Sequence, residues 1–374
     1  MKLSAPALMI TTLVLAGCAS KDNIAASAPA TASTADVAPA STGGMLKPSV
    51  SSNGMLKPPT APADTTLAQT GRDPAEFPAY VEALKRQAVA QGIDRQTVDS
   101  AFANVHFVDR VIKADRNQLE KKITLDVYLQ RVLSPTKIQQ GRQLLRQYQP
   151  QLARATARYG VPERYIVALW AMESHYGKIQ GKEDVVSALS TLAFEGRREA
   201  FFSKQLMAAL QIIQQGHVPA EQLTGSWAGA MGQCQFMPSS FLSYGADGDG
   251  DGRIDIWHNL DDVFASTANY LATEGWKPGI GWGREVTLPS GFGSGHLGLK
   301  NGQARSVNQW AAMGIRQADG SALPSATLRS WIITPDDAQG RAFMVYDNFR
   351  TIMHWNRSYY FAISVGMMAD AVGQ

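Results

Sequence analysis

The chain has 374 residues, of which 45% are hydrophobic and 18% are charged, so it is long enough for one large domain or two to three smaller ones. Its formal net charge of +3 gives no case for nucleic-acid binding. Beyond the N-terminus, no apolar run is long enough to span a bilayer.

The first residues have the layout of a secretory signal, in which Lys2 precedes a short apolar run and small residues. The segment LAGC at 15–18 resembles the lipobox of bacterial lipoproteins. The resemblance implies removal of residues 1–17 as a signal peptide and lipidation of Cys18. Because Ala19 follows, and not Asp, it points to an outer-membrane lipoprotein on the periplasmic face. The alternative is an ordinary signal peptide with an incidental cysteine.

Cysteine usage leaves little scope for disulfide or thiol chemistry. With Cys18 acylated, only Cys234 remains, so an intramolecular disulfide cannot form even in an oxidising compartment. A nucleophilic Cys234 would need a partner base, and no nearby histidine suggests one.

Residues 19 to 72 are rich in Ala, Ser, Thr, Pro and Gly and contain almost no large apolar side chains. Such a composition cannot bury enough surface to offset the entropy of ordering, so 18–72 is expected to be a lipidated cysteine followed by a disordered tether. The motif GMLKP occurs twice in it, at 44–48 and 54–58. We interpret this as a duplicated linker, with a short docking motif as the alternative.

An N-terminal helical region is expected over 73–150. Asp73, Pro74 and Glu76 form a capping-box pattern that begins the first helix. Helices are predicted at 74–91, 94–104 and 109–131. A further helix begins with Ser134 as cap and Pro135 at its first position, is kinked or broken by Pro150, and ends at Gly160.

The remaining chain divides into a core at 151–284, a small β-containing subdomain at 285–346 and a closing helix in 347–374. Core helices are predicted after Pro162 and at 184–194, 198–215 and 261–274. Segments such as EVTLP, TLRSWIIT and AFMVYD carry β-branched and aromatic residues between turn signals. The sequence therefore predicts a mainly α (α+β) fold.

The helix after Pro162 carries an acid on its apolar stripe. Ile166, Leu169 and Trp170 recur at helical spacing, and Glu173 is the next position on the same face. A buried carboxylate either pairs with a cation or raises its pKa. Two interpretations remain open at this point. Glu173 is either a structural ion pair, with Arg197 or Arg198 as partner, or a general acid kept protonated by desolvation.

Two long segments carry a family resemblance. ALWAMESHYGKIQGKEDVVSALSTLAFEGRR and GSWAGAMGQCQFMPSSFLSYGADGDGDGRIDIW resemble the lytic murein transglycosylases of the membrane-bound B type. The resemblance covers residues 74 to 370 and implies a lysozyme-like core. It also implies that Glu173 is the sole catalytic acid/base and that the chemistry needs no cofactor. The implied reaction cleaves the MurNAc-β-1,4-GlcNAc bond of peptidoglycan glycan strands and leaves 1,6-anhydro-MurNAc ends.

The same resemblance assigns a substrate groove. It places Ser226, Gln235, Tyr270 and Asn356 at substrate-binding positions. It also matches Arg197 and Arg198 to a basic pair that suits an acidic peptide stem or lactyl carboxylate. Two positions depart from the family pattern, because Trp355 and Phe361 stand where tyrosines are usual, and the loss of a hydroxyl at 361 puts a hydrogen bond there in doubt.

The segment DGDGDGRIDIWHNLDD resembles an EF-hand loop. Asp247, Asp249 and Asp251 occupy ligand positions 1, 3 and 5, and the carbonyl of Arg253 occupies position 7. Position 12 holds His258 instead of an acid. The family resemblance implies a longer loop closed by Asp261 and one structural Ca²⁺; Na⁺, an empty site or a plain solvated turn are the alternatives.

Two other functions compete with the resemblance. One is a catalytically idle, wall-binding lipoprotein that recruits other cell-wall enzymes, although a scaffold has no reason to keep Glu173. The other is a true hydrolase with Glu183, Asp184 or Glu195 as second carboxylate. The products released from peptidoglycan distinguish all three.

Overall fold

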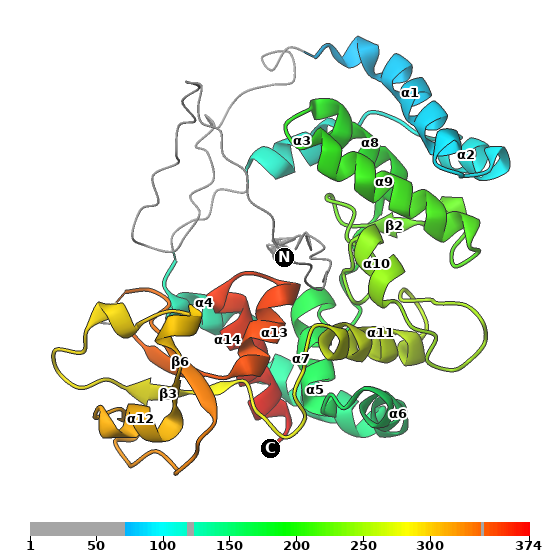
Figure 1. Cartoon of the computed structure of the whole chain (residues 1–374). Helices are drawn as coiled ribbons and strands as arrows, with labels where there is room; N and C mark the ends of the chain where they lie inside the picture. Colours follow the sequence, from blue (N-terminus) through cyan, green and yellow to red (C-terminus); the bar gives the residue numbers. More distant parts are fainter. Residues whose placement is uncertain (1–71, 118–122, 338–339) are drawn as a thin grey trace, which may run out of the picture. The chain divides into compact units, whose positions relative to one another are not determined.

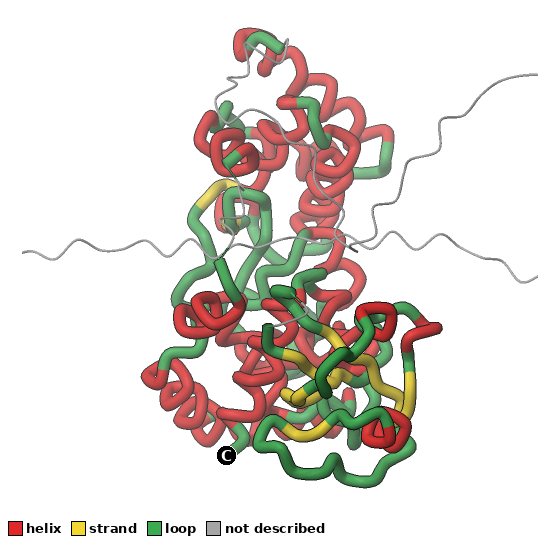
Figure 2. Tube along the Cα trace, turned by 90° about the vertical axis from the view of Figure 1, so that its left-hand side faces the viewer, coloured by secondary structure: helices red, strands yellow, loops and turns green. Residues whose placement is uncertain are grey.

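A computed structural model describes residues 72–117, 123–337 and 340–374 (Figure 1). The expected signal peptide, Cys18 and the tether through residue 71 lie outside the described residues, and so do both GMLKP motifs. The described part is mainly helical, and most of its strands gather in one region (Figure 2). The predicted mainly α class with a minor β part is confirmed.

Most of the predicted helices are present within a residue or two of their expected limits. The helices are α1 (Phe77–Ala90), α2 (Arg95–Phe102), α3 (Asp109–Arg116), α4 (Leu125–Val132), α5 (Pro135–Gln147), α6 (Gln149–Tyr159), α7 (Glu163–Ser174), α8 (Val185–Glu195), α9 (Glu199–Gln214), α10 (Pro238–Tyr244), α11 (Leu260–Thr273), α12 (Val307–Ala312), α13 (Asp347–Trp355) and α14 (Tyr359–Val372). Helices α10 and α12 were not predicted, because each is only about two turns long and carries little periodic signal.

Two predicted helices are each interrupted. The helix expected over 109–131 is two helices, α3 and α4, because Thr124 caps a new start by accepting from Val127 N at 3.4 Å. The closing helix likewise divides into α13 and α14, since Ser358 caps the second by accepting from Phe361 N at 3.3 Å. Both caps are readable in the sequence, and the prediction of single helices was wrong.

Helix α7 lies in the interior of the fold. Every residue from Tyr165 to Ser174 is buried, so the apolar stripe of the sequence is one side of a helix that is covered all round. It packs against α5, α6, α11 and α14 (Figure 1). An interior helix gives its side chains fixed surroundings, which a catalytic group needs.

The sheet has five strands in the order β4-β6-β7-β3-β5, and all its named pairings are antiparallel. Its strands are β3 (Gly283–Thr287), β4 (Arg305–Ser306), β5 (Arg316–Gln317), β6 (Arg329–Ile333) and β7 (Ala342–Val345). A separate two-stranded pair joins β1 (Glu183–Asp184) to β2 (Thr224–Gly225). The three segments predicted as strands match β3, β6 and β7.

Two hydrophobic clusters underlie these elements. The larger draws on residues from α1 through α14, so the N-terminal helices share one core with α7. The smaller lies at the sheet, around Trp310, Ile332 and Met344.

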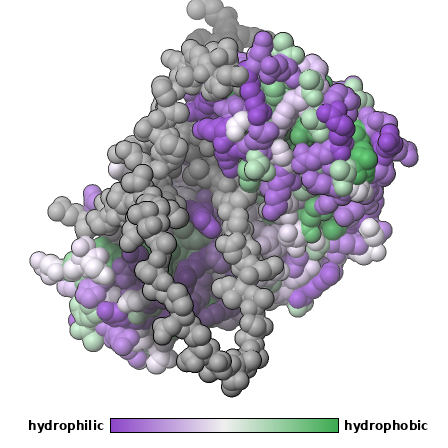
Figure 3. Space-filling model, turned by 45° about the horizontal axis from the view of Figure 1, so that its top comes forward, coloured by the Kyte–Doolittle hydropathy of each residue, from purple (hydrophilic) through white to green (hydrophobic). Residues whose placement is uncertain are grey.

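On the face drawn in Figure 3, the visible surface of the described residues is mostly hydrophilic, with small hydrophobic patches. None of the described helices combines the length and apolar character that crossing a bilayer requires.

Candidate active site

Glu173 stands in the last turn of α7, where the helix stops abruptly. The next residues, His175 and Tyr176, adopt left-handed conformations with φ of 50° and 59°, which is unusual for side chains other than glycine. The negative end of a helix dipole disfavours a carboxylate placed there. The local backbone therefore already opposes ionisation of Glu173.

Burial opposes ionisation of Glu173 further. The residue is only 6% exposed, and its Oε1 accepts a hydrogen bond from Trp355 Nε1 at 2.8 Å. Desolvation raises the pKa of Glu173 to about 8, although the Trp355 hydrogen bond and the charge of Lys137 each act to lower it. A carboxyl group with this pKa holds its proton at neutral pH.

Lys137, near the start of α5, is the cation that acts on Glu173 among the described residues. Burial lowers the pKa of its ammonium to about 8, and the charge of Glu173 counteracts this. Tyr176 OH donates to Lys137 O at 2.7 Å and so joins α5 to the turn after Glu173. Lys137 could not be predicted from the sequence, because no short motif links it to a residue 36 positions away.

The predicted arginine partners of Glu173 lie against another acid. Arg197 Nη2 donates to the buried carboxylate of Asp115, and Arg198 Nη1 lies 3.9 Å from the same side chain. The guanidinium of Arg198 also covers the ring of Phe201, 4.4 Å from its centroid. The structure thus gives no support to the interpretation of Glu173 as an ion pair with these arginines.

The three carboxylates considered as a second hydrolytic group are also engaged elsewhere. Glu183 pairs with Arg110, and Asp184 caps α8 by accepting from Ser187 N at 2.6 Å. Glu195 Oε1 accepts from Arg116 Nη2 at 2.8 Å, with both side chains at most 10% exposed.

An aromatic wall made of Phe236, Tyr244, Tyr270 and Trp355 lies beside Glu173. The Trp355 ring lies 4.6 Å from that of Tyr270 and 5.2 Å from that of Phe236, and Tyr244 continues the wall at 4.3 Å from Tyr270. The predicted groove residue Tyr270 thus packs against the tryptophan that donates to Glu173. Trp355 and Tyr244 are additional candidates that the sequence analysis did not assign to the groove.

The loop 226–237 contributes two of the predicted groove residues. Ser226 Oγ accepts from Ala230 N at 3.0 Å, so it shapes the loop and keeps its own O–H free to donate. Gln235 has a left-handed backbone with φ of 50°, and its Nε2 donates to Gln180 O at 3.0 Å. Strain of this kind collects at functional sites. Gly181 is required here, because any Cβ at its φ of +86° would overlap Gly225 O.

Hydrogen bonds join the same loop to α7 and to the segment that contains Trp257. Gln233 Oε1 accepts from Trp170 Nε1 at 2.7 Å, and its Nε2 donates to Trp257 O at 2.9 Å. The side chain of Gln233 therefore has a structural role. Next to it, Cys234 is 2% exposed, and burial raises the pKa of its thiol to about 12, which agrees with an inert cysteine.

Asn356 lies at the break between α13 and α14. It is 4% exposed, and its Oδ1 has no hydrogen-bond partner among the described residues. A buried acceptor without a partner is costly, so the amide is suited to a donor from outside the described chain. Phe361 is buried in the core, and its ring offers no hydrogen bond to replace that of a tyrosine.

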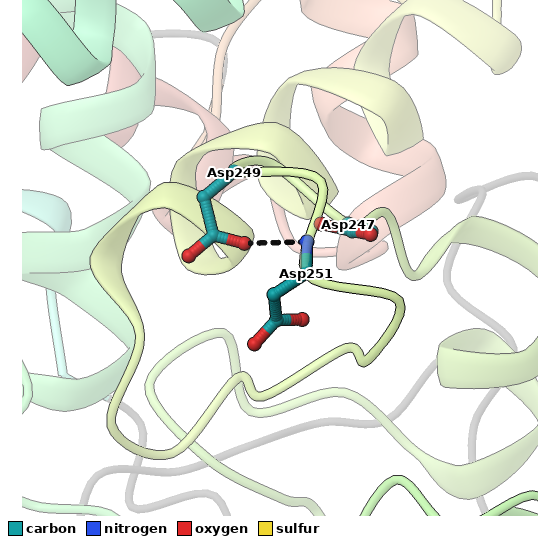
Figure 4. A group of neighbouring side chains, drawn as sticks. All are labelled: Asp247, Asp249 and Asp251. Atoms are coloured by element: carbon teal, nitrogen blue, oxygen red, sulfur yellow. Dashed lines mark hydrogen bonds between the residues drawn. The ribbon is translucent and has the colours of Figure 1, made fainter.

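The acidic loop brings Asp247, Asp249 and Asp251 together, with one carboxylate oxygen of each within 4.8 Å of the others (Figure 4). Asp247 accepts from the backbone N–H groups of Gly252 and Gly250, which lower the pKa of Asp247. Hard carboxylate oxygens on a tight loop fit a cation such as Ca²⁺.

The expected closing ligand Asp261 lies outside this cluster. Its carboxylate pairs with Arg154 from α6, and its own N–H donates to Asn259 Oδ1 at 3.0 Å. The neighbouring Asp262 is fully buried and accepts from Gly248 N at 2.7 Å and Asp255 N at 2.6 Å, so it holds the two ends of the loop. Arg253 directs its side chain to His217 O at 3.2 Å.

Comparisons with known proteins agree on one family. The model of the transglycosylase SLT domain matches residues 76–370. The chain is 30% identical over 324 residues to membrane-bound lytic murein transglycosylase B of Escherichia coli, covering 82% of this chain and 86% of that one.

Solved structures are similar as well. SltB3 of Pseudomonas aeruginosa in complex with NAG-anhNAM-pentapeptide has a TM-score of 0.77 and 43% identity, and the match covers 79% of each chain. The Escherichia coli lytic transglycosylase Slt35 in complex with calcium has a TM-score of 0.68 and 30% identity, covering 79% of this chain and 92% of that one.

Proposed function

The chain belongs to the transglycosylase SLT domain family and is a peptidoglycan lytic transglycosylase, and from this premise we propose that it cleaves the MurNAc-β-1,4-GlcNAc bond with Glu173 as its single acid/base. The product would carry 1,6-anhydro-MurNAc ends. The observation that carries this proposal is a 94% buried carboxyl group whose hydrogen-bond donor is an uncharged indole and whose pKa is raised to about 8.

In the first step Glu173 acts as general acid. Its proton passes to O4 of the leaving GlcNAc as the bond between MurNAc C1 and that oxygen breaks. The positive charge that develops at C1 is relieved by the neighbouring N-acetyl group of MurNAc. Lys137 stabilises the carboxylate that Glu173 becomes, because its ammonium acts on that group.

In the second step Glu173 acts as general base. The carboxylate takes the proton of the MurNAc C6 hydroxyl while O6 forms a bond to C1, which closes the anhydro ring. The acid form is regenerated and no water is consumed. An intramolecular nucleophile can reach an effective molarity of about 10⁵–10⁸ M, so a second protein carboxylate is unnecessary. This agrees with the engagement of Glu183, Asp184 and Glu195 elsewhere.

Substrate would lie along the aromatic wall. Sugar faces pack on aromatic rings, here Tyr270 and Trp355. The Ser226 hydroxyl and the side-chain amide oxygens of Gln235 and Asn356 suit sugar hydroxyl and N-acetyl groups. We assign the acidic peptide stem or lactyl carboxylate to Arg197 and Arg198, whose side chains are 42% and 39% exposed. The relative SltB3 was solved with a NAG-anhNAM-pentapeptide, which is a ligand of this class.

Product analysis tests the proposed reaction. Purified sacculi digested with the protein are expected to release muropeptides that end in 1,6-anhydro-MurNAc, detected by mass spectrometry as a mass lower by one water than the hydrolytic product. Reducing-end MurNAc would show a hydrolase and would overturn the mechanism. Binding to sacculi with no soluble product would overturn catalysis altogether.

We further propose that the acidic loop holds one structural Ca²⁺ through Asp247, Asp249, Asp251 and the Arg253 carbonyl. Asp261 would complete the site on leaving Arg154. The ion supplies rigidity to the loop, and through Trp257 and Gln233 this rigidity reaches Trp170, one turn before Glu173. Support comes from the relative Slt35, which was solved with calcium.

We also propose that the protein is an outer-membrane lipoprotein on the periplasmic face, attached through Cys18. The lipobox-like segment and the membrane-bound relative support this assignment. In fractionated cells the full-length chain is expected in the outer membrane, and Cys18→Ala is expected in the soluble periplasm after signal cleavage. A Cys18→Ala chain that stays in the membrane fraction would contradict lipidation. Such an anchor would hold the enzyme near its glycan substrate and near other cell-wall enzymes.

A further inference from the structure

Trp355 donates a hydrogen bond to the carboxyl group of Glu173 from a distant part of the chain. Its Nε1 lies 2.8 Å from Oε1 of the acid, and the two residues are 182 positions apart in the chain. An indole N–H only donates, so the oxygen opposite must offer a lone pair in every protonation state. A tyrosine hydroxyl, which can also accept, would not impose this condition.

In a protonated carboxyl group the two oxygens differ. The carbonyl oxygen is the better acceptor, while the other oxygen carries the hydrogen and acts as donor. We propose that Trp355 is a positioning residue that keeps Oε1 of Glu173 as the carbonyl oxygen and thereby confines the catalytic proton to Oε2. This inference rests on the proposed role of Glu173 as acid/base.

The surroundings of Trp355 hold its indole in place. The ring packs between Tyr270 and Phe236, and the residue closes α13 just before the break at Asn356. Because the donor does not move between the two steps, Oε2 both gives the proton to O4 and recovers it from the C6 hydroxyl. One oxygen thus performs both transfers, and the carboxyl group need not rotate between them.

Within the part of the chain that the structure describes, few other ionisable groups face Glu173. Lys137 comes from α5, Tyr128 from α4 and Cys234 from the loop 226–237, and each interacts electrostatically with the carboxyl group. His175 lies two residues after Glu173, and burial together with the charge of Lys137 lowers the pKa of its imidazole. Removing the indole N–H leaves all of these groups present, so a change in titration reports the lost hydrogen bond.

Trp355→Phe is the direct test, because it keeps an aromatic ring and removes the donor. The N–H favours the carboxylate over the acid, so its loss is expected to raise the pKa of Glu173 by about one unit. The titration is followed by NMR of a ¹³C-labelled carboxyl group. The alkaline limb of the pH profile of the single-turnover rate is expected to shift to higher pH as well. The rate at neutral pH is expected to fall about 10- to 100-fold, because the proton is no longer confined to one oxygen.

Trp282→Phe is the matched control. Trp282 Nε1 also donates to a carboxylate, Asp370 Oδ2 at 2.8 Å, and the residue is 3% exposed. The Trp282→Phe variant is expected to change the stability of the protein and to leave the pH profile of the rate unchanged. If Trp355→Phe fails to fold, benzothienylalanine at 355 keeps the size of the indole and replaces its N–H by sulfur.

Two results separate the inference from the proposed function. A folded Trp355 variant with the wild-type pH profile and rate would overturn the positioning role while Glu173→Gln remained inactive. Activity in Glu173→Gln would instead overturn the acid/base assignment itself.

Discussion

Glu173→Gln is expected to lose at least 10³-fold in the rate of anhydro-muropeptide release, because glutamine has no proton to donate and cannot take one back. Gln retains an oxygen that can accept from Trp355 Nε1, so the packing around position 173 is expected to be preserved. The measurement is the initial rate on purified sacculi, with folding verified by circular dichroism.

The same substitution is expected to stabilise the protein. In the unfolded chain the Glu173 carboxyl titrates near its ordinary pKa of 4.5, whereas in the folded chain its pKa is about 8. Between these values the unfolded state is ionised and the folded state keeps the proton, so stability falls as pH rises through this window. The free energy of unfolding of the wild type therefore decreases by about 1.4 kcal/mol per pH unit in this window, which amounts to roughly 3 kcal/mol at pH 7.

Urea unfolding of the wild type and Glu173→Gln at pH 5 and pH 8 measures this effect. The variant is expected to gain stability over the wild type as the pH increases. Glu183→Gln is the control, since Glu183 is ion-paired with Arg110, and it is expected to stay active without this pH-dependent gain. A constant difference between the wild type and Glu173→Gln at both pH values would show that the folded carboxyl group is ionised and would refute its role as acid.

Calcium is expected to raise the unfolding temperature of the chelator-treated protein by about 5 °C at a concentration 100 times its dissociation constant. Such saturation adds about 2.7 kcal/mol to the free energy of unfolding, because the ion binds the folded loop and not the unfolded chain. The measurement is differential scanning calorimetry at fixed ionic strength, with NaCl in place of CaCl₂ as the reference.

Asp251→Asn sharpens this test. Its amide oxygen can still accept from Arg253 N, as Asp251 Oδ1 does at 2.8 Å, so the turn is kept while a negative charge at the proposed site is removed. Asp319→Asn is the matched control, because Asp319 accepts from Ser321 N in a similar exposed turn outside the loop. The calcium shift is expected to become smaller in the first variant, because a charged ligand becomes neutral, and to keep its size in the second. An equal shift with Na⁺, or an unchanged calcium shift in Asp251→Asn, would contradict the site.

Much of the fold was predictable because its signals are local. Pro135 and Pro150 begin or interrupt helices where their chemistry requires, and Gly160 ends one in the left-handed conformation. The division of two long helices was also encoded, by Thr124 and Ser358, but caps inside an otherwise periodic run are easily passed over.

The site was predictable only in part, because its contacts are not local. Glu173 stood out as an acid on an apolar face, and its burial confirms that signal. Trp355 and Lys137 approach it from α13 and α5, and no spacing rule connects elements so far apart along the chain. The pairing of Arg197 with Asp115 depends on the same kind of tertiary packing, so residue types alone left the partner of each arginine open.

The buried thiol in the loop beside Glu173 gives the protein a built-in reporter of local opening. Cys234 Sγ lies 3.5 Å from Val263 O and Thr267 Oγ1 on α11, and both its burial and its raised pKa prevent alkylation while the loop stays seated. Alkylating reagents reach it only when this segment detaches from α11. The rate at which the Cys234 thiol is alkylated therefore measures how often the segment detaches, without an engineered probe.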